Sequence, residues 1–210
     1  MTQKDIESFV RSNFLLSPAK AAPEIFLYQH HPRSGLTKFL GGDIKPPYWA
    51  YCWAGGNVLA RYILDHPENL AGRHVLDIGA GSGIVAIAAA KAGAASVTAI
   101  DIDIHAVAVT QLNAEANAVK IEVHHGDGLR GTIPKSDLIT MGDLFYNEAL
   151  ARRAFSFAKT CHTAGIEVWI GDPGRKSLPA AQLRVLAEVS VPDFGQSAPS
   201  SAAVYILNLP

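Results

Sequence analysis

Cysteine is scarce in this sequence: Cys52 and Cys161 are the only two among 210 residues, and they form no Cys-x-x-Cys spacing. This argues against a disulfide-rich scaffold and a cysteine zinc site, and it makes a reducing cytosol the default compartment. No apolar run reaches the roughly 18 residues of a membrane span. The first residues lack both a signal-peptide apolar core and the arginine-rich, acid-free bias of a transit sequence. We therefore expect a cytoplasmic protein with no membrane partner.

Neither sign of charge is in excess, because 18 lysine and arginine residues nearly balance 19 aspartate and glutamate residues. A nearly neutral chain gives no electrostatic reason to expect a nucleic-acid partner. Clustered metal ligands are also lacking. The adjacent pairs His30-His31 and His124-His125 would point to opposite faces of a strand, so neither pair makes a metal site by itself and we expect no metal.

What the sequence does contain is a strand, a glycine-rich turn, a helix and a second strand between residues 74 and 103. The short apolar runs 75–78 and 97–100 are typical of buried parallel strands. Between them, the alanine-rich run 84–92 predicts a helix packed on the sheet, with Gly93 as its C-cap. This order of elements indicates an α/β fold.

The turn of this unit carries Gly79, Gly81 and Gly83, where a backbone without a Cβ atom can approach a ligand closely. Asp101 ends the second strand, where a carboxylate can accept the hydroxyls of a ribose. A dinucleotide fingerprint G-x-G-x-x-G would need glycine at position 84, which is Ile84 here. The pattern predicts a nucleotide-type cofactor site, the alternative being a generic α/β turn with structural glycines.

With Asp77 leading, the D-x-G-x-G-x-G motif resembles the first motif of the class I, seven-strand S-adenosylmethionine-dependent methyltransferases. The resemblance implies that the glycine loop holds the amino-acid end of S-adenosylmethionine and that Asp101 holds its ribose. It also implies a Rossmann-like seven-strand sheet with helices on both faces. The expected cofactor-binding residues are Asp77, Gly79, Gly81, Gly83, Asp101, Ile102, Asp127 and Trp53.

The N-terminal 56 residues read as an extension packed on a core of residues 57–210, within one domain. Apolar residues on one helical face, with Thr2 as cap, predict a helix over 3–14. Runs at 24–29 and 36–40, separated by a proline and a glycine, suggest a hairpin. A helix should follow from about residue 57 to residue 64.

Four aromatic residues gather just before that helix, next to prolines and glycines: Tyr48, Trp49, Tyr51 and Trp53. They could wall a cofactor or substrate pocket, or they could pack the N-terminal extension onto the sheet, and the sequence favours neither.

Further along, the sequence predicts a helix over 103–119, strands at 121–123 and 137–141, and a fifth strand leading into Trp169–Arg175. A helix at 178–190 and closing strands at 188–191 and 202–209 should complete the core. Asp127 follows the strand at 121–123, where class I methyltransferases often contact the adenine amine; it could equally cap the next turn. Asp172 and Arg175 could contact a protein substrate, although pairing with each other is favoured.

Gly142-Asp143-Leu144-Phe145-Tyr146 follows the fourth core strand, at the edge where ligands bind in open α/β sheets. A carboxylate suits a cationic lysine ammonium, with Phe145 and Tyr146 able to flank its alkyl stem. The catalytic residues expected are therefore Asp143, Phe145 and Tyr146. Asp143 could also cap the helix that follows.

The chain resembles the seven-strand protein lysine methyltransferases, whose fourth-strand motif is D-x-x-Y, and within them the electron transfer flavoprotein β-subunit lysine methyltransferases. The stretches that carry this resemblance are PPYWAYCWAGG (46–56), VLDIGAGSGIVAIAAAKAGA (75–94), AIDIDIHA (99–106), GDLFYNEALA (142–151) and WIGDPGR (169–175). The resemblance implies methylation of lysines in the β-subunit's recognition loop. Animal members are mitochondrial, so the missing transit peptide favours a bacterial cytoplasmic member.

The implied reaction is transfer of methyl from the sulfonium to a neutral lysine amine. With a solution pKa of about 10.4, that amine is scarce by roughly a thousandfold near pH 7.4. A nearby carboxylate favours the ammonium, so Asp143 is assigned to capture and orientation, not to simple proton removal.

Three alternatives remain from the sequence: a ribosomal protein as target, a small-molecule methyltransferase, and a cofactor-binding regulatory module without catalysis. The target lysines, the number of methyl groups and the oligomeric state stay open.

Overall fold

The computed structural model describes residues 2–41, 47–133, 135–196 and 198–209. Pro46, the first residue of one of the stretches that carry the resemblance, lies outside them. Within these residues, no helix combines the length and the apolar character needed to cross a bilayer.

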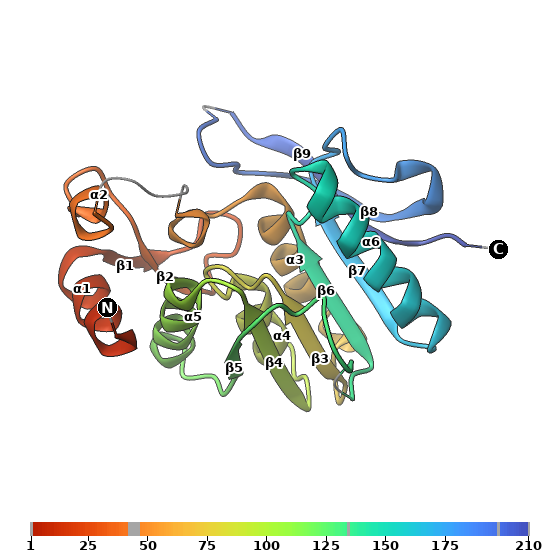
Figure 1. The fold of residues 1–210 in the computed structure, drawn as a ribbon, viewed down its shortest axis with the longest axis horizontal. Helices are drawn as coiled ribbons and strands as arrows, with labels where there is room; N and C mark the ends of the chain where they lie inside the picture. The colour runs from red at the N-terminus through yellow and green to blue at the C-terminus, as the bar shows by residue number, and fades with distance from the viewer. Residues whose placement is uncertain (1, 42–46, 134, 197, 210) are drawn as a thin grey trace.

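A seven-stranded sheet forms the centre of the molecule, in the order β5-β4-β3-β6-β7-β9-β8 (Figure 1). Its first five strands are parallel, and β9 runs antiparallel to both β7 and β8. The predicted seven-strand α/β fold is confirmed. The strands are β3 (His74–Ile78), β4 (Ser96–Asp101), β5 (Glu122–His125), β6 (Leu138–Gly142), β7 (Glu167–Asp172), β8 (Leu183–Val191) and β9 (Ser200–Leu207).

Helices cover both faces of this sheet, because alternate residues of the inner strands are buried on opposite sides. Val75 of β3 packs in the cluster formed with α3 (Ala54–Asp65) and α4 (Ile84–Lys91). The next residue, Leu76, packs in the cluster that includes α6 (Glu148–Thr163). The predicted helices at 57–64, 84–92 and 103–119 correspond to α3, α4 and α5 (Ile104–Ala116), with α3 starting earlier than expected.

The N-terminal segment packs against α5. Its first helix, α1 (Gln3–Asn13), starts at a capping box in which Thr2 and Asp5 bond each other's backbone, as the predicted cap required. Ile6 and Val10 of α1 are fully buried in a cluster with Leu112 of α5. A cap and an apolar stripe thus fix this helix on the core.

The predicted hairpin between 24–29 and 36–40 is wrong. Strand β2 (Phe26–Gln29) instead pairs antiparallel with β1 (Leu15–Pro18). Residues Leu36–Phe39 form a short helix, α2, which follows Gly35 in the left-handed region. One helical turn lets Leu36 and Leu40 bury side by side in the cluster with α1 and α5. Burial of this pair outweighs the extended tendency of the run.

The predicted helix at 178–190 is also wrong, since only Ala180–Gln182 forms a 3-10 turn and β8 follows at once. Leucine, arginine, alanine and glutamate favour helix in isolation, but β8 pairs with β9 along its whole length. Tertiary pairing therefore overrides local propensity here. The predicted strands at 188–191 and 202–209 fall within or overlap β8 and β9.

Candidate functional site

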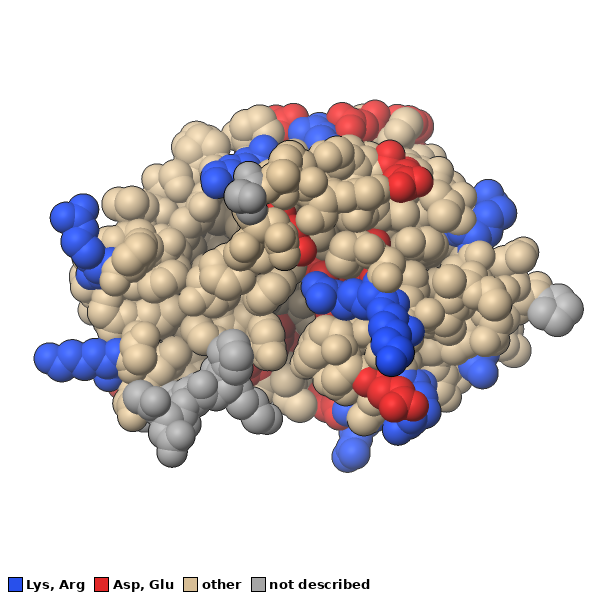
Figure 2. Space-filling view, turned by 90° about the horizontal axis from the view of Figure 1, so that it is seen from above, with Lys and Arg blue, Asp and Glu red and all other residues tan. Residues whose placement is uncertain are grey.

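The site lies where the strand order reverses, between β3 and β6, at the carboxyl ends of the strands. An open cleft is lined by parts of three segments, 48–56, 77–85 and 142–143. Figure 2 looks onto this side of the molecule and shows a hollow near its centre with acidic atoms inside it. Segments far apart in the sequence thus meet at one sheet edge.

The glycine loop after β3 needs its glycines for space as well as for backbone angle. Gly79, Gly81 and Gly83 all adopt left-handed backbone angles. A Cβ on Gly83 would come within 2.8 Å of Thr110 on α5. Asp101, at the end of β4, accepts the Gly81 N–H at 2.9 Å and so ties the loop to the neighbouring strand. Burial raises the pKa of Asp101.

Asp77 is a buried acid with one unused oxygen. Its side chain is 1% exposed, and its Oδ1 accepts a hydrogen bond from Thr140 at 2.7 Å, across the β3–β6 pair. Its Oδ2 has no hydrogen-bond partner among the residues that the structure describes. Burial raises the pKa of Asp77 to about 7. A carboxylate that lines a cleft in this state fits a ligand carrying an ammonium group, as the amino-acid end of S-adenosylmethionine does.

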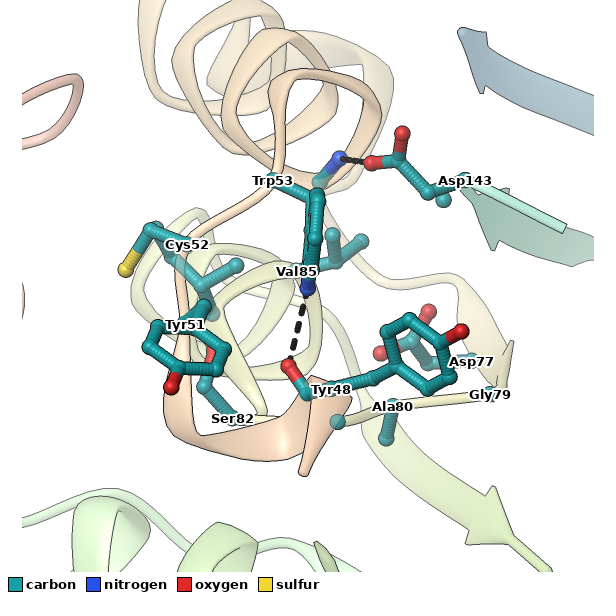
Figure 3. Close-up of a pocket in the computed structure, with 14 residues that line it drawn as sticks. Tyr48, Tyr51, Cys52, Trp53, Asp77, Gly79, Ala80, Ser82, Val85 and Asp143 are labelled. Atoms are coloured by element: carbon teal, nitrogen blue, oxygen red, sulfur yellow. Dashed lines mark hydrogen bonds between the residues drawn. The ribbon is translucent and has the colours of Figure 1, made fainter. Parts of the chain in front are cut away.

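The aromatic cluster divides between the two roles that the sequence left open. Tyr48, Tyr51 and Trp53 line the cleft, and the Trp53 indole N–H donates to the Tyr48 carbonyl at 2.9 Å (Figure 3). Trp49 is buried and stacks on His105 of α5 with ring centroids 5.7 Å apart. The first three residues therefore wall the pocket, whereas Trp49 packs the N-terminal segment onto the core.

Asp143 sits in the cleft with its carboxylate held from two sides. Its backbone is in the left-handed region, with φ at 56°, and its N–H donates to the Gly171 carbonyl. Oδ2 accepts the Gly56 N–H at 2.9 Å, as Figure 3 shows, and Oδ1 accepts Arg175 Nη2 at 2.7 Å. Burial raises the pKa of Asp143, and the Arg175 guanidinium opposes that rise. The helix-cap alternative is wrong, because Asn147 caps α6.

Close backbone packing explains the glycines that flank this acid. A Cβ on Gly55 would overlap the Gly171 carbonyl oxygen, and a Cβ on Gly171 would overlap the Gly55 carbonyl oxygen. At Gly142 an added Cβ would lie 3.1 Å from the Gly56 Cα. The start of α3 therefore rests directly on the ends of β6 and β7, which places the Gly56 N–H beside Asp143.

Phe145 does not lie in the cleft, which corrects its predicted role. It is 0% exposed and packs in the cluster with α6 and the inner strands. The next residue, Tyr146, is 47% exposed, and its ring lies 5.4 Å from that of Tyr48. The tight turn after Asp143 sends the two neighbouring rings to different sides, and the ring that lies beside Tyr146 is that of Tyr48.

Asp127 and Ile102 lie at the ends of the neighbouring strands. Asp127 caps a turn by accepting the Leu129 N–H, and its other oxygen pairs with Arg153 and Arg130. The turn-capping alternative is thus the one observed, and an adenine contact stays a prediction. Ile102 follows β4 and is 68% exposed.

Among the described residues, no three histidine, cysteine, aspartate or glutamate side chains are grouped to hold a metal.

The favoured pairing of Asp172 with Arg175 is present but weak. Asp172 Oδ1 accepts the backbone N–H groups of Gly174 and Arg175, at 2.8 and 2.7 Å, which shapes the Asp-Pro-Gly turn. The side chains are further apart, with Arg175 Nε 3.8 Å from Asp172 Oδ2. The closer partner of Arg175 is Asp143, which sequence reasoning missed. Its signal was available, because both residues follow the carboxyl ends of adjacent parallel strands.

Relatives of known name cover most of the chain. It is 39% identical over 201 residues to the electron transfer flavoprotein beta subunit lysine methyltransferase of Danio rerio, spanning 91% of this chain and 78% of that protein. The Homo sapiens protein of that name is 39% identical over 81% of this chain and 67% of its own length. The Caenorhabditis elegans homolog is 30% identical, over 87% and 86%.

A family model described as ribosomal protein L11 methyltransferase (PrmA) matches residues 59–141. Among solved structures, magnesium protoporphyrin IX methyltransferase from Synechocystis PCC 6803 with bound SAH superposes with a TM-score of 0.53 at 16% identity, covering 81% of this chain and 92% of that one. Ribosomal protein L11 methylase from Lactobacillus delbrueckii superposes with a TM-score of 0.51 at 20% identity, over 72% and 77%. These structural likenesses concern the fold alone.

Proposed function

The chain belongs to the family of electron transfer flavoprotein beta subunit lysine methyltransferases, which are S-adenosylmethionine-dependent enzymes, and from this we propose that it methylates lysine residues of an electron transfer flavoprotein β-subunit. The observation that most supports this substrate is the identity of 39% over 91% of the chain. The chemistry of the cleft also supports a lysine substrate. The side of the cleft at Asp143, here called the acceptor side, carries that carboxylate and the exposed rings of Tyr48 and Tyr146.

S-adenosylmethionine supplies an electrophilic methyl group when bound. We assign its ammonium to the unpaired oxygen of Asp77 and its ribose hydroxyls to Asp101, next to the exposed Ile102. Trp53 and the glycine loop would close the cleft around the amino-acid end. The buried position of Asp77 supports this assignment, since an ammonium there would bond the carboxylate oxygen that Thr140 leaves unpaired among the described residues.

On the acceptor side, we assign Asp143 to capture and orient the target lysine. Its carboxylate offers a charge-assisted hydrogen bond to an ammonium. The tilted pair of Tyr48 and Tyr146 rings lies at the rim, where it can flank the alkyl stem and reduce the hydration of the amine. Orientation of the amine toward the methyl group, rather than deprotonation by Asp143, is then the contribution of these side chains.

The test is to incubate the purified protein and radiolabelled S-adenosylmethionine with recombinant electron transfer flavoprotein and, separately, with a cytosolic lysate. Label mapped by mass spectrometry to β-subunit lysines supports the proposal, and the Asp143→Asn variant serves as the control for transfer at this site. Label only on another protein would overturn the substrate while keeping the lysine chemistry. Label only in small molecules would overturn both.

A ribosomal protein is the second candidate substrate, because residues 59–141 match the L11 methyltransferase model. That match includes the glycine loop but stops before Asp143, so it supports the cofactor half of the site more than the acceptor half. A cytoplasmic location stays a prediction from the sequence, and fractionation of the source cells tests it.

A further inference from the structure

Arg175 lies between the carboxylates of Asp143, which is partly buried, and Asp172, which is fully buried, and it bonds only the first of them well. Its Nη2 donates to Asp143 Oδ1 at 2.7 Å. Its Nε lies 3.8 Å from Asp172 Oδ2, beyond hydrogen-bonding distance. Asp172 is fully buried, and within the described part of the chain neither this oxygen nor the Arg175 Nε has a hydrogen-bond partner. A buried donor and a buried acceptor therefore face each other without bonding, which is unfavourable for both.

The charges in this cluster do not balance. Two carboxylates, Asp143 and Asp172, share one guanidinium, so the ionised cluster is short of one positive charge. Burial raises the pKa of Asp172 to about 6, and the charge of Asp143 contributes to that rise. A second cation that entered the cleft would give each carboxylate its own partner. The ammonium of a target lysine is such a cation.

The two oxygens of Asp143 differ in their partners. Oδ2 accepts the Gly56 backbone N–H, whereas Oδ1 bonds the Arg175 guanidinium, so Oδ1 is the atom at which one cation can replace another. Arg175 needs to move by only roughly 1 Å to turn the 3.8 Å approach to Asp172 into a charge-assisted hydrogen bond. The new bond between Arg175 and Asp172 would join two groups that are already in the site, and only the lysine ammonium comes from outside it.

We propose that the Arg175 guanidinium occupies the position on Asp143 that the target lysine later takes. When the lysine ammonium binds there, Arg175 shifts onto Asp172. This inference rests on the proposed function, since it takes a lysine as the acceptor. The exchange makes Arg175 a positioning residue and Asp172 its receiving carboxylate. The exchange also favours cationic acceptors. If a neutral hydroxyl or amide replaced the guanidinium at Asp143, the carboxylate would be left with no cation beside it.

The Asp172→Asn variant tests the exchange. It keeps an Oδ1 acceptor for the Gly174 and Arg175 backbone N–H groups, so the turn survives, but it removes the receiving charge. We expect KM for the protein substrate to rise about tenfold while kcat and cofactor affinity stay within about twofold. The matched control is Asp65→Asn, at the exposed end of α3. An unchanged or lower KM in Asp172→Asn would overturn the exchange.

A second measurement needs no protein substrate, so it separates failure of this inference from failure of the proposed function. The side-chain Nε–H signal of Arg175, identified by its loss in Arg175→Lys, is followed by ¹⁵N NMR while n-butylammonium is added as a mimic of the lysine side chain. Slower hydrogen exchange of that Nε–H supports the shift onto Asp172. No response, or the same response in Asp172→Asn, refutes it, whereas a wild-type enzyme that leaves the flavoprotein unlabelled refutes only the substrate.

Discussion

Replacing Asp77 by asparagine should make the free energy of unfolding fall less steeply as the pH rises. Burial raises the pKa of Asp77 to about 7, against about 3.9 in an unfolded chain. The folded state therefore binds more protons than the unfolded state between these values, and stability falls as the pH rises through that window. Three units correspond to about 4 kcal/mol, of which roughly half is lost between pH 5.5 and pH 8.

Asparagine removes this titration and keeps the acceptor for the Thr140 hydroxyl, while its amide places a buried donor where Oδ2 stood. That donor costs about 1–3 kcal/mol at every pH, so the absolute stability is a poor readout and the pH dependence is a good one. Between pH 5.5 and pH 8, urea denaturation should show the wild type losing about 2 kcal/mol more than the variant. Other raised carboxyl groups titrate in both proteins and cancel.

The same variant should bind S-adenosylhomocysteine, which carries the same ammonium, about 10- to 100-fold more weakly in calorimetry. Asp65→Asn, an exposed position, is the control for both measurements. Parallel stability curves for wild type and Asp77→Asn would refute the raised pKa. Unchanged affinity would remove Asp77 from the cofactor site.

Five further variants, one of them a control, test the acceptor side and the packing beneath it. Asp143→Asn should lower kcat/KM for the lysine substrate about 100-fold, with cofactor affinity within about twofold; weak cofactor binding would place Asp143 in the cofactor site instead. Phe145→Ala should lower the free energy of unfolding by about 3–5 kcal/mol, whereas Tyr146→Ala should raise KM at nearly unchanged stability; the reverse pattern in denaturation and rate measurements would restore Phe145 to the cleft. Gly55→Ala should cost about 2–3 kcal/mol in denaturation, and Gly126→Ala, where an added Cβ meets nothing within 4 Å, should cost far less.

The cofactor half of the site was predictable because its determinants are local. Strand, glycine turn and helix follow one another without a break from His74 to Lys91, and Asp101 ends the adjacent parallel strand. In such a unit the carboxyl ends of the two strands must meet at one edge. The order of elements therefore predicted that the glycine loop and Asp101 would lie together, as the hydrogen bond between Gly81 and Asp101 shows, whereas their binding of the cofactor stays a prediction.

The acceptor half depended on directions that a sequence does not report. Phe145 and Tyr146 are adjacent aromatic residues in a turn, and only packing against α6 decides that the first is buried. The contact of Arg175 with Asp143 crosses from one strand end to the next, so the strand order can indicate that the two segments are near, but it does not indicate that these two side chains pair. Likewise, the pairing partner of β8 lies beyond a loop, and its own residues suggest a helix.

The glycine contact between α3 and the sheet has a consequence for protein engineering. Gly55, Gly142 and Gly171 come from three separate segments, yet each leaves room for backbone of another. Transplanting the acidic turn at Asp143 into another protein of this fold would bring its carboxylate without its amide donor unless all three glycines travelled with it. No single contiguous motif is therefore enough to transfer this site to another protein. The three backbone segments around Gly55, Gly142 and Gly171 would have to be transferred or redesigned together.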